Sequence, residues 1–203
     1  MIDNTKPTED FWMVVKRLTD DASRCMIMLE EAAEDDAEVK SFWRRMYARA
    51  VFAILDSAVY GMIYHAYVTR HRPNAEFSPE EMFRLEGAYD FDEDAEAIAV
   101  FSKEQMLDDM RFAFIVFARV HSCYYRLPTH EPEWVHLKEI ARIRQTLRYP
   151  RETDYLEVYE ENIDDLVAGL HWFVSRSLDL FKSCAQAMEE LKLPGSEADE
   201  IVM

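Results

Sequence analysis

The stretch from Ala37 to Thr69, AEVKSFWRRMYARAVFAILDSAVYGMIYHAYVT, decides the fold class. Its middle part is apolar nearly all round, and Asp56 is the only acidic residue between Val39 and His71. A helix that is apolar all round is buried by other elements of the protein. We therefore expect this stretch to form a long central helix that other helices cover.

The apolar run from Val51 to Val68 approaches the length of a membrane span. Asp56, Ser57 and His65 interrupt this run, which favours the buried helix of a soluble protein over a membrane helix. No charged and then apolar leader begins the chain, because the first ten residues are polar. We expect a cytoplasmic protein that does not associate with membranes.

Composition supports a helical protein. The 203 residues are 49% hydrophobic and 13% aromatic, which is enough to fill a core. Only 4 glycines and 7 prolines are present, too few turn residues for a sandwich or barrel of many short strands. The sequence therefore predicts an all-α, up-and-down helical bundle of about five main helices plus a short helix.

Apolar residues recur every three or four positions in several other segments, as in amphipathic helices. Capping residues and prolines mark where these helices begin and end. The expected helices run from about Thr8 to Leu29, Ala37 to Thr69, Ser78 onward for a short helix, Ser102 to about Tyr124, Trp134 to Tyr149, and Asn162 to about Leu191. We expect one domain over residues 1–195, a loop over 87–100, and a disordered acidic tail over 196–203.

The formal net charge is −17, from 40 acidic and 23 basic residues. A field of this sign repels nucleic acid overall, so we expect no DNA binding, and any polyanion must bind a local patch. The Glu133 and His136 spacing is that of di-iron bundles, but a second such pair is missing. We expect no metal and no cofactor.

One segment departs from the acidic character of the chain. Between Lys138 and Arg151 there are five basic residues and one acidic residue. Arg144, Arg148 and Arg151 are four and three positions apart, so they share one side of a helix as far as that helix continues. Either a solvated surface or an anion-binding surface is consistent with this pattern.

The segment Ile143–Pro150, IRQTLRYP, together with the polar loop after it and a long final helix that carries Trp172, resembles the HEPN superfamily. The resemblance covers residues 37–191 in helix order and rests on about eight motif residues. It implies an α-helical bundle that is often dimeric. Active members are RNases with an arginine, then a polar residue, then a histidine about five positions after the arginine, frequently followed by proline. Arg144, Gln145 and Pro150 match this motif.

Tyr149 stands where the motif histidine is expected. A phenol, with an ordinary pKa of about 10, is a poor proton acceptor near neutral pH. The resemblance therefore implies a non-catalytic homodimer that binds a nucleotide, RNA or a protein partner. An HEPN-type metal-independent RNase and a plain protein-interaction module are the alternatives.

We expect Asp56 to be substantially buried and to lie within ion-pair distance of an arginine, because an unpaired carboxylate in an apolar helix is costly. Arg144 is the first candidate partner and Arg49 the second, unless Asp56 faces a solvent groove. The candidate ligand-binding residues are therefore Arg144, Arg148, Tyr149, Arg151 and Asp56, and no catalytic residue is assigned.

Overall fold

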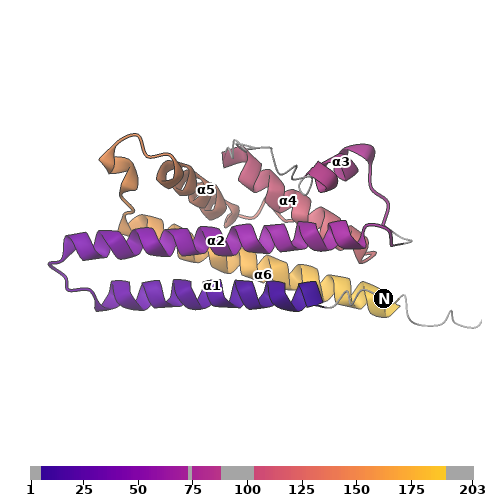
Figure 1. Ribbon diagram of the computed structural model, residues 1–203, viewed down its shortest axis with the longest axis horizontal. Helices are drawn as coiled ribbons and strands as arrows, with labels where there is room; N and C mark the ends of the chain where they lie inside the picture. The colour runs from indigo at the N-terminus through magenta and orange to yellow at the C-terminus, as the bar shows by residue number, and fades with distance from the viewer. Residues whose placement is uncertain (1–5, 73–74, 88–102, 191–203) are drawn as a thin grey trace, which may run out of the picture.

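The computed structural model describes residues 6–72, 75–87 and 103–190, and this part of the chain is all-α (Figure 1). Its elements, in chain order, are α1 (Lys6–Glu31), α2 (Ala37–Thr69), α3 (Pro79–Gly87), α4 (Lys103–Val120), α5 (Trp134–Arg148), the 3₁₀ helix η1 (Thr153–Leu156) and α6 (Glu160–Glu190). The all-α prediction is confirmed, with five long helices and the short α3 among the described residues. The predicted loop over 87–100, the Ser102 cap and the acidic tail lie almost entirely outside these ranges.

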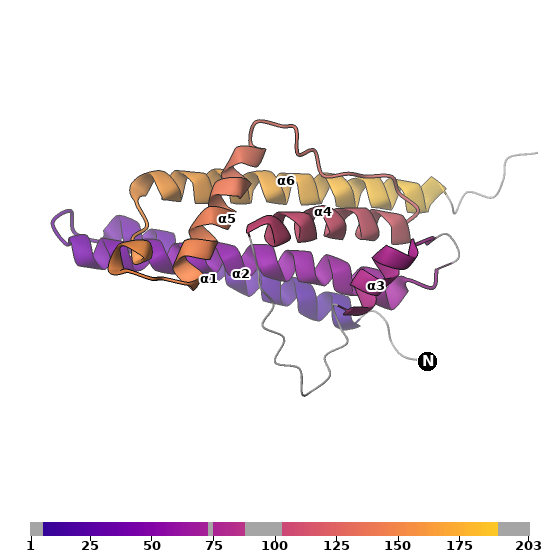
Figure 2. The same ribbon diagram turned by 90° about the horizontal axis from the view of Figure 1, so that it is seen from above.

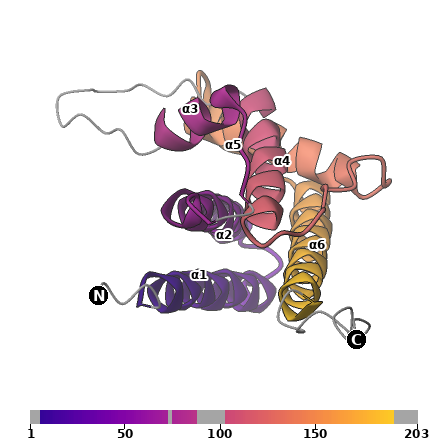
Figure 3. The ribbon, with the colours of Figure 1, turned by 90° about the vertical axis from the view of Figure 1, so that its right-hand side faces the viewer.

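Helix α2 is the centre of the bundle, as its sequence predicts. Seen along the bundle in Figure 3, α1 lies on one side of α2, α3 to α5 lie on the opposite side, and α6 runs beside them. Helix α5 crosses the other helices steeply (Figure 2). Much of the middle of α2 is buried, including Val51, Leu55 and Met62, whereas Asp56 and Tyr60 lie on a side that is left exposed. The core therefore forms where α2, α4, α5 and α6 meet.

By length and composition α2 could also cross a membrane, with a mean hydropathy of 1.3 in its most apolar window. The core helix of a soluble protein passes the same test, and 44% of that window is buried in the bundle. The cytoplasmic location stays a prediction.

Side-chain hydrogen bonds cap the starts of α2 and α3, and the α3 cap was predicted from the sequence. Asp36 accepts a hydrogen bond from the Val39 N–H (3.1 Å) and caps α2. At α3 the Ser78 hydroxyl accepts from the Glu81 N–H (3.2 Å), while the Glu81 carboxylate accepts from the Ser78 N–H (2.9 Å). This reciprocal pair is a capping box, and it confirms the helix start predicted at Ser78.

Two other helix starts differ from the prediction. Helix α1 begins at Lys6 rather than near Thr8. Helix α6 begins at Glu160, so Asn162 lies inside its first turn instead of preceding it. The buried Asn162 side chain accepts from the Tyr159 N–H (3.0 Å), so it still satisfies a backbone donor at the helix start.

Helix α4 ends at Val120, four residues before the predicted end at Tyr124. The Cys123 N–H donates to the Ala118 carbonyl (2.9 Å) and the Ser122 N–H to the Arg119 carbonyl (3.0 Å). These two bonds form a Schellman motif, and Ser122 takes its left-handed position with a φ of 55°. Glycine is the usual residue there, so the sequence carries no glycine signal for this helix end.

Helices α5 and α6 approach closely at Gly169. A Cβ atom added to Gly169 would lie 2.5 Å from Ile140 Cδ1 and 3.3 Å from His136 Cβ. Both are α5 residues, and the Ile140 side chain is fully buried. The absence of a side chain at Gly169 therefore sets the separation of the two helices and with it the position of α5.

Candidate functional site

Helix α5 carries the arginines that the sequence singles out, and its apolar face fixes their direction. Its buried residues are Trp134, Leu137, Ile140, Ala141, Ile143 and Leu147. Among the arginines at the remaining positions, Arg142 and Arg148 are exposed, whereas Arg144 is mostly covered and reaches α2. The helix ends at Tyr149, whose N–H donates to the Gln145 carbonyl (3.3 Å), and Pro150 follows.

Arg144 joins α5 to α2 through Asp56. Arg144 Nη2 donates to Asp56 Oδ2 at 2.7 Å, which confirms Arg144 as the partner of Asp56. The predicted burial of Asp56 is wrong, because 47% of its side chain is exposed, whereas only 14% of the Arg144 side chain is exposed. The arginine is therefore the buried member of the pair, and the carboxylate lies at the surface end.

The carboxylate of Asp56 nevertheless loses part of its hydration, since protein atoms surround its inner side. This loss of hydration raises the pKa of Asp56, while the nearby positive charges of Arg144 and Arg148 act to lower it. Arg148 follows Arg144 by one helical turn on α5, on the same side of the helix. Asp56, Arg144 and Arg148 thus form one charged group across α2 and α5.

Arg148, Tyr149 and Arg151 form the exposed end of this group, which we call the α5 arginine surface. All three residues are exposed, and 52% of Tyr149 is accessible. The Arg148 guanidinium carbon lies 5.5 Å from the centre of the Tyr149 ring, within the range of a cation–π contact. Arg151 follows the end of α5, so it extends the positive surface beyond the helix.

His136 does not join this group. Its Nδ1 lies 2.7 Å from Asp165 Oδ1 on α6, whereas Arg144 contacts α2. His136 therefore pairs with a carboxylate on a different helix from the one that Arg144 engages. Within the described residues, no three His, Cys, Asp or Glu side chains are grouped closely enough to hold a metal ion.

The sequence reasoning missed a stacked histidine pair between α2 and the end of α4. The rings of His65 and His121 lie 5.0 Å apart and nearly parallel, at 8°. His65 Nε2 is buried and has no hydrogen-bond partner among the described residues. Loss of hydration, together with the positive charges of His121 and Arg72, lowers the pKa of His65 to about 4. The helical spacing of both residues was visible, but nothing in the sequence indicated that they would meet.

Comparisons with known proteins do not identify a family for this chain. The chain matches no protein-family model, and no match was found among curated proteins or solved structures. The resemblance to HEPN domains therefore stays a prediction that rests on the residues of the α5 motif.

Proposed function

We propose that the protein is a non-catalytic, HEPN-like binding or regulatory protein that holds the phosphate groups of a nucleotide or RNA on the α5 arginine surface. The observation that carries this proposal is the Arg144–Asp56 ion pair, which is followed on α5 by the exposed Arg148 against Tyr149 and, three residues later in the chain, by the exposed Arg151. The pair ties the end of α5 to the central helix. The exposed arginines are thereby presented on a fixed support.

The chemistry of the surface suits phosphate groups. Guanidinium groups donate two parallel hydrogen bonds to phosphate or carboxylate oxygens, and arginine also stacks on aromatic rings. Exposed aromatic rings such as Tyr149 provide a stacking platform for a nucleic-acid base. The end of α5 carries a partial negative charge of its own, so the guanidinium groups have to supply the attraction for an anion.

The same geometry supports a role without catalysis. Cleavage of RNA by its 2′-hydroxyl needs a group that accepts a proton near neutral pH. Tyr149 is a phenol, which is a poor proton acceptor at this pH. His136 pairs with Asp165 on α6, whereas Arg144 pairs with Asp56 on α2. Arg144 itself is occupied by Asp56 and is mostly buried. Anion binding is therefore favoured over hydrolysis.

The test is fluorescence anisotropy with a labelled, mixed-sequence single-stranded RNA at low salt, in chelator. Arg148→Ala/Arg151→Ala should weaken binding at least about tenfold and reduce the slope of log affinity against log salt. Lys16→Ala/Arg24→Ala is the matched control, since it removes the same charge from exposed positions on α1. The control should leave binding within about twofold of the parent.

Gel analysis of the same mixtures distinguishes the alternatives. Intact RNA together with binding lost only in the α5 variant supports the proposal. Cleavage that disappears in Arg144→Ala would establish the RNase alternative instead. Equal anisotropy for the two double variants, or no binding at low salt, would leave a protein-interaction module as the better description.

A further inference from the structure

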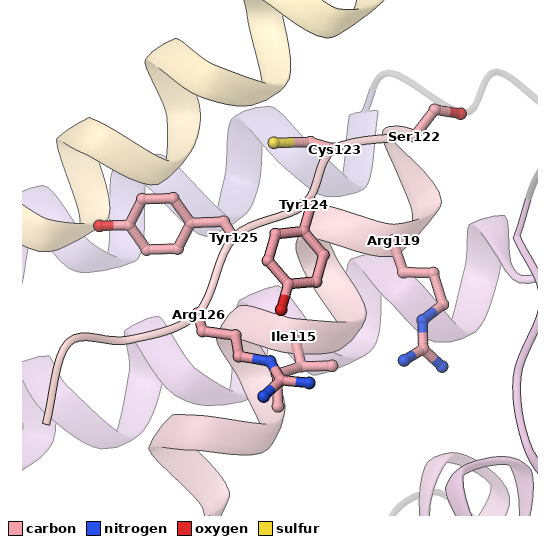
Figure 4. Close-up of a pocket in the computed structure, with 7 residues that line it drawn as sticks. All are labelled: Ile115, Arg119, Ser122, Cys123, Tyr124, Tyr125 and Arg126. Carbon is pink, nitrogen blue, oxygen red and sulfur yellow. The ribbon is translucent and has the colours of Figure 1, made fainter.

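A pocket of about 300 Å³ opens at the end of α4, away from the α5 arginine surface (Figure 4). Ile115 and Arg119 of α4 line one side, and the segment from Ser122 to Arg126 lines the other. None of these lining residues belongs to α5, so the pocket is a separate site.

The segment after α4 alternates in exposure in the manner of an extended strand. Ser122, Tyr124 and Arg126 are exposed, whereas Cys123 and Tyr125 are partly covered. The Tyr125 hydroxyl donates to the Arg176 carbonyl on α6 (3.2 Å) and so anchors the inner side of the segment. Tyr124 and Arg126 consequently share the outer side, and Figure 4 shows both side chains extending toward Ile115.

Tyr124 provides an aromatic wall that the described part of the chain leaves uncovered. Its exposed fraction is 84%, although a tyrosine ring gains free energy when its apolar faces are covered. The guanidinium carbon of Arg126 lies 5.6 Å from the centre of this ring. A planar molecule stacked on Tyr124 therefore lies within reach of a guanidinium group.

The pocket carries one positive charge that no carboxylate of the described residues pairs with. Arg119 forms an ion pair with the Glu81 carboxylate and donates a hydrogen bond to the Glu76 carbonyl (3.1 Å). Partial burial of Glu81 acts to raise its pKa, but hydrogen bonds from Arg119 and Ser78 outweigh this effect and lower the pKa. Arg126, by contrast, contacts no carboxylate among the described residues, in a chain with 40 acidic residues.

The helix end beside the pocket does not repel an anion strongly, because its carbonyl groups are occupied. Ser122 and Cys123 N–H groups bond the Arg119 and Ala118 carbonyls. The Val120 carbonyl accepts from Arg72 (3.2 Å), and His121 Nδ1 lies 2.8 Å from the Phe117 carbonyl. Satisfied carbonyls contribute less of the partial negative charge that a free helix end presents.

We propose that this pocket binds a small planar ring that carries a single carboxylate. The ring stacks on Tyr124 above Ile115, and the carboxylate takes two hydrogen bonds from the Arg126 guanidinium. A volume of about 300 Å³ is at the small end of ligand pockets, so it suits one ring with one acidic group. A single unbalanced charge likewise suits a monoanion.

The experiment is an NMR titration of the full chain with benzoate, with phenol and inorganic phosphate as separate arms. Benzoate should give saturable shifts with a Kd of about 1 mM or below, and bind at least about fivefold more tightly than either control compound. Arg126→Gln and Tyr124→Ala should each weaken benzoate binding at least about tenfold. Both residues are exposed, so the variants should keep the thermal stability of the parent.

Arg148→Gln is the matched control, because it neutralises an exposed arginine on the α5 arginine surface instead. It should leave benzoate binding unchanged, which keeps this result independent of RNA binding at α5. No saturable shift up to about 10 mM, or the same affinity in Arg126→Gln, would overturn the proposal. Phosphate binding as tight as benzoate binding would also overturn it, because the pocket would then recognise charge without the ring.

Discussion

The stacked pair of His65 and His121 predicts how the stability of the fold depends on pH. The pKa of His65 lies at about 4 in the folded protein, against an ordinary value of 6.5. Between these two values the unfolded chain binds a proton at this position and the folded protein does not. The free energy of unfolding therefore falls as the pH drops from about 6.5 toward 4. The stabilisation that comes from the neutral His65 is fully present above about pH 7.

The size of this effect follows from the shift. A fall in pKa from 6.5 to about 4 corresponds to at most about 3 kcal/mol, at 1.36 kcal/mol per unit. The His65 ring is partly solvent-accessible, and screening by water lowers the contribution to about 2 kcal/mol. Protonation of His65 would also place a charge next to His121 and Arg72.

The assay is urea unfolding of the parent and of His65→Phe at several pH values from 7.5 to 4.5. Phenylalanine preserves the aromatic contacts with His121 and Phe117, and it removes both the titration and the unpaired Nε2 atom. We expect the parent to lose about 2 kcal/mol more than His65→Phe across this range. His171→Gln, which changes an exposed histidine, should behave like the parent. Parallel stability curves for the parent and His65→Phe would refute the reasoning.

Four other predictions follow from the packing and the charges. Gly169→Ala should destabilise the fold by about 1 to 2 kcal/mol in thermal unfolding, since the new methyl group meets Ile140 at 2.5 Å; an unchanged Tm would contradict this close approach. Ser122→Gly should stabilise the fold by about 0.5 to 1 kcal/mol because it relieves the left-handed backbone, and a loss of stability in urea unfolding would argue against that strain. Asp56→Ala should cost about 1 to 2 kcal/mol, less than for a buried pair, as it leaves the mostly covered Arg144 without this partner; stability within a few tenths of the parent would count against the ion pair. Light scattering should give twice the 24.0 kDa mass of one chain, and a monomer at all micromolar concentrations would contradict the expected homodimer.

The bounds of α2 show what the sequence can predict. An apolar stretch with few polar interruptions predicts a helix over Ala37–Thr69, as found, while the Asp36 cap is seen only in the structure. The Asp56 partner was also predictable, because a carboxylate in such a stretch requires a positive charge. The exposure of Asp56 was not predictable, because it depends on which side of α2 the neighbouring helices leave open. Tyr60, one turn further along α2, is likewise 53% exposed.

The pocket and the histidine pair could not be predicted for a different reason. The chain turns away from α4 at Ser122, which adopts a left-handed conformation although it is not glycine. Because glycine is the usual signal for such a helix end, the apolar pattern alone predicted a helix as far as Tyr124. Placed on a helix, Tyr124 and Arg126 would not have shared one side. His65 and His121 are more than fifty residues apart in the sequence, and only the tertiary packing of α2 against α4 brings the rings together.

The position of α1 at the edge of the bundle has a consequence for folding cooperativity. This helix packs mainly against α2, and Ala22 and Cys25 are the only buried side chains among residues 13–31. Separating α1 would therefore expose one side of α2 and leave the contacts among α4, α5 and α6 in place. Segments with few buried apolar contacts open at lower free energy than the core. The amide hydrogens of α1 then exchange with solvent through a partial opening, well before the global unfolding that releases those of α4 and α6.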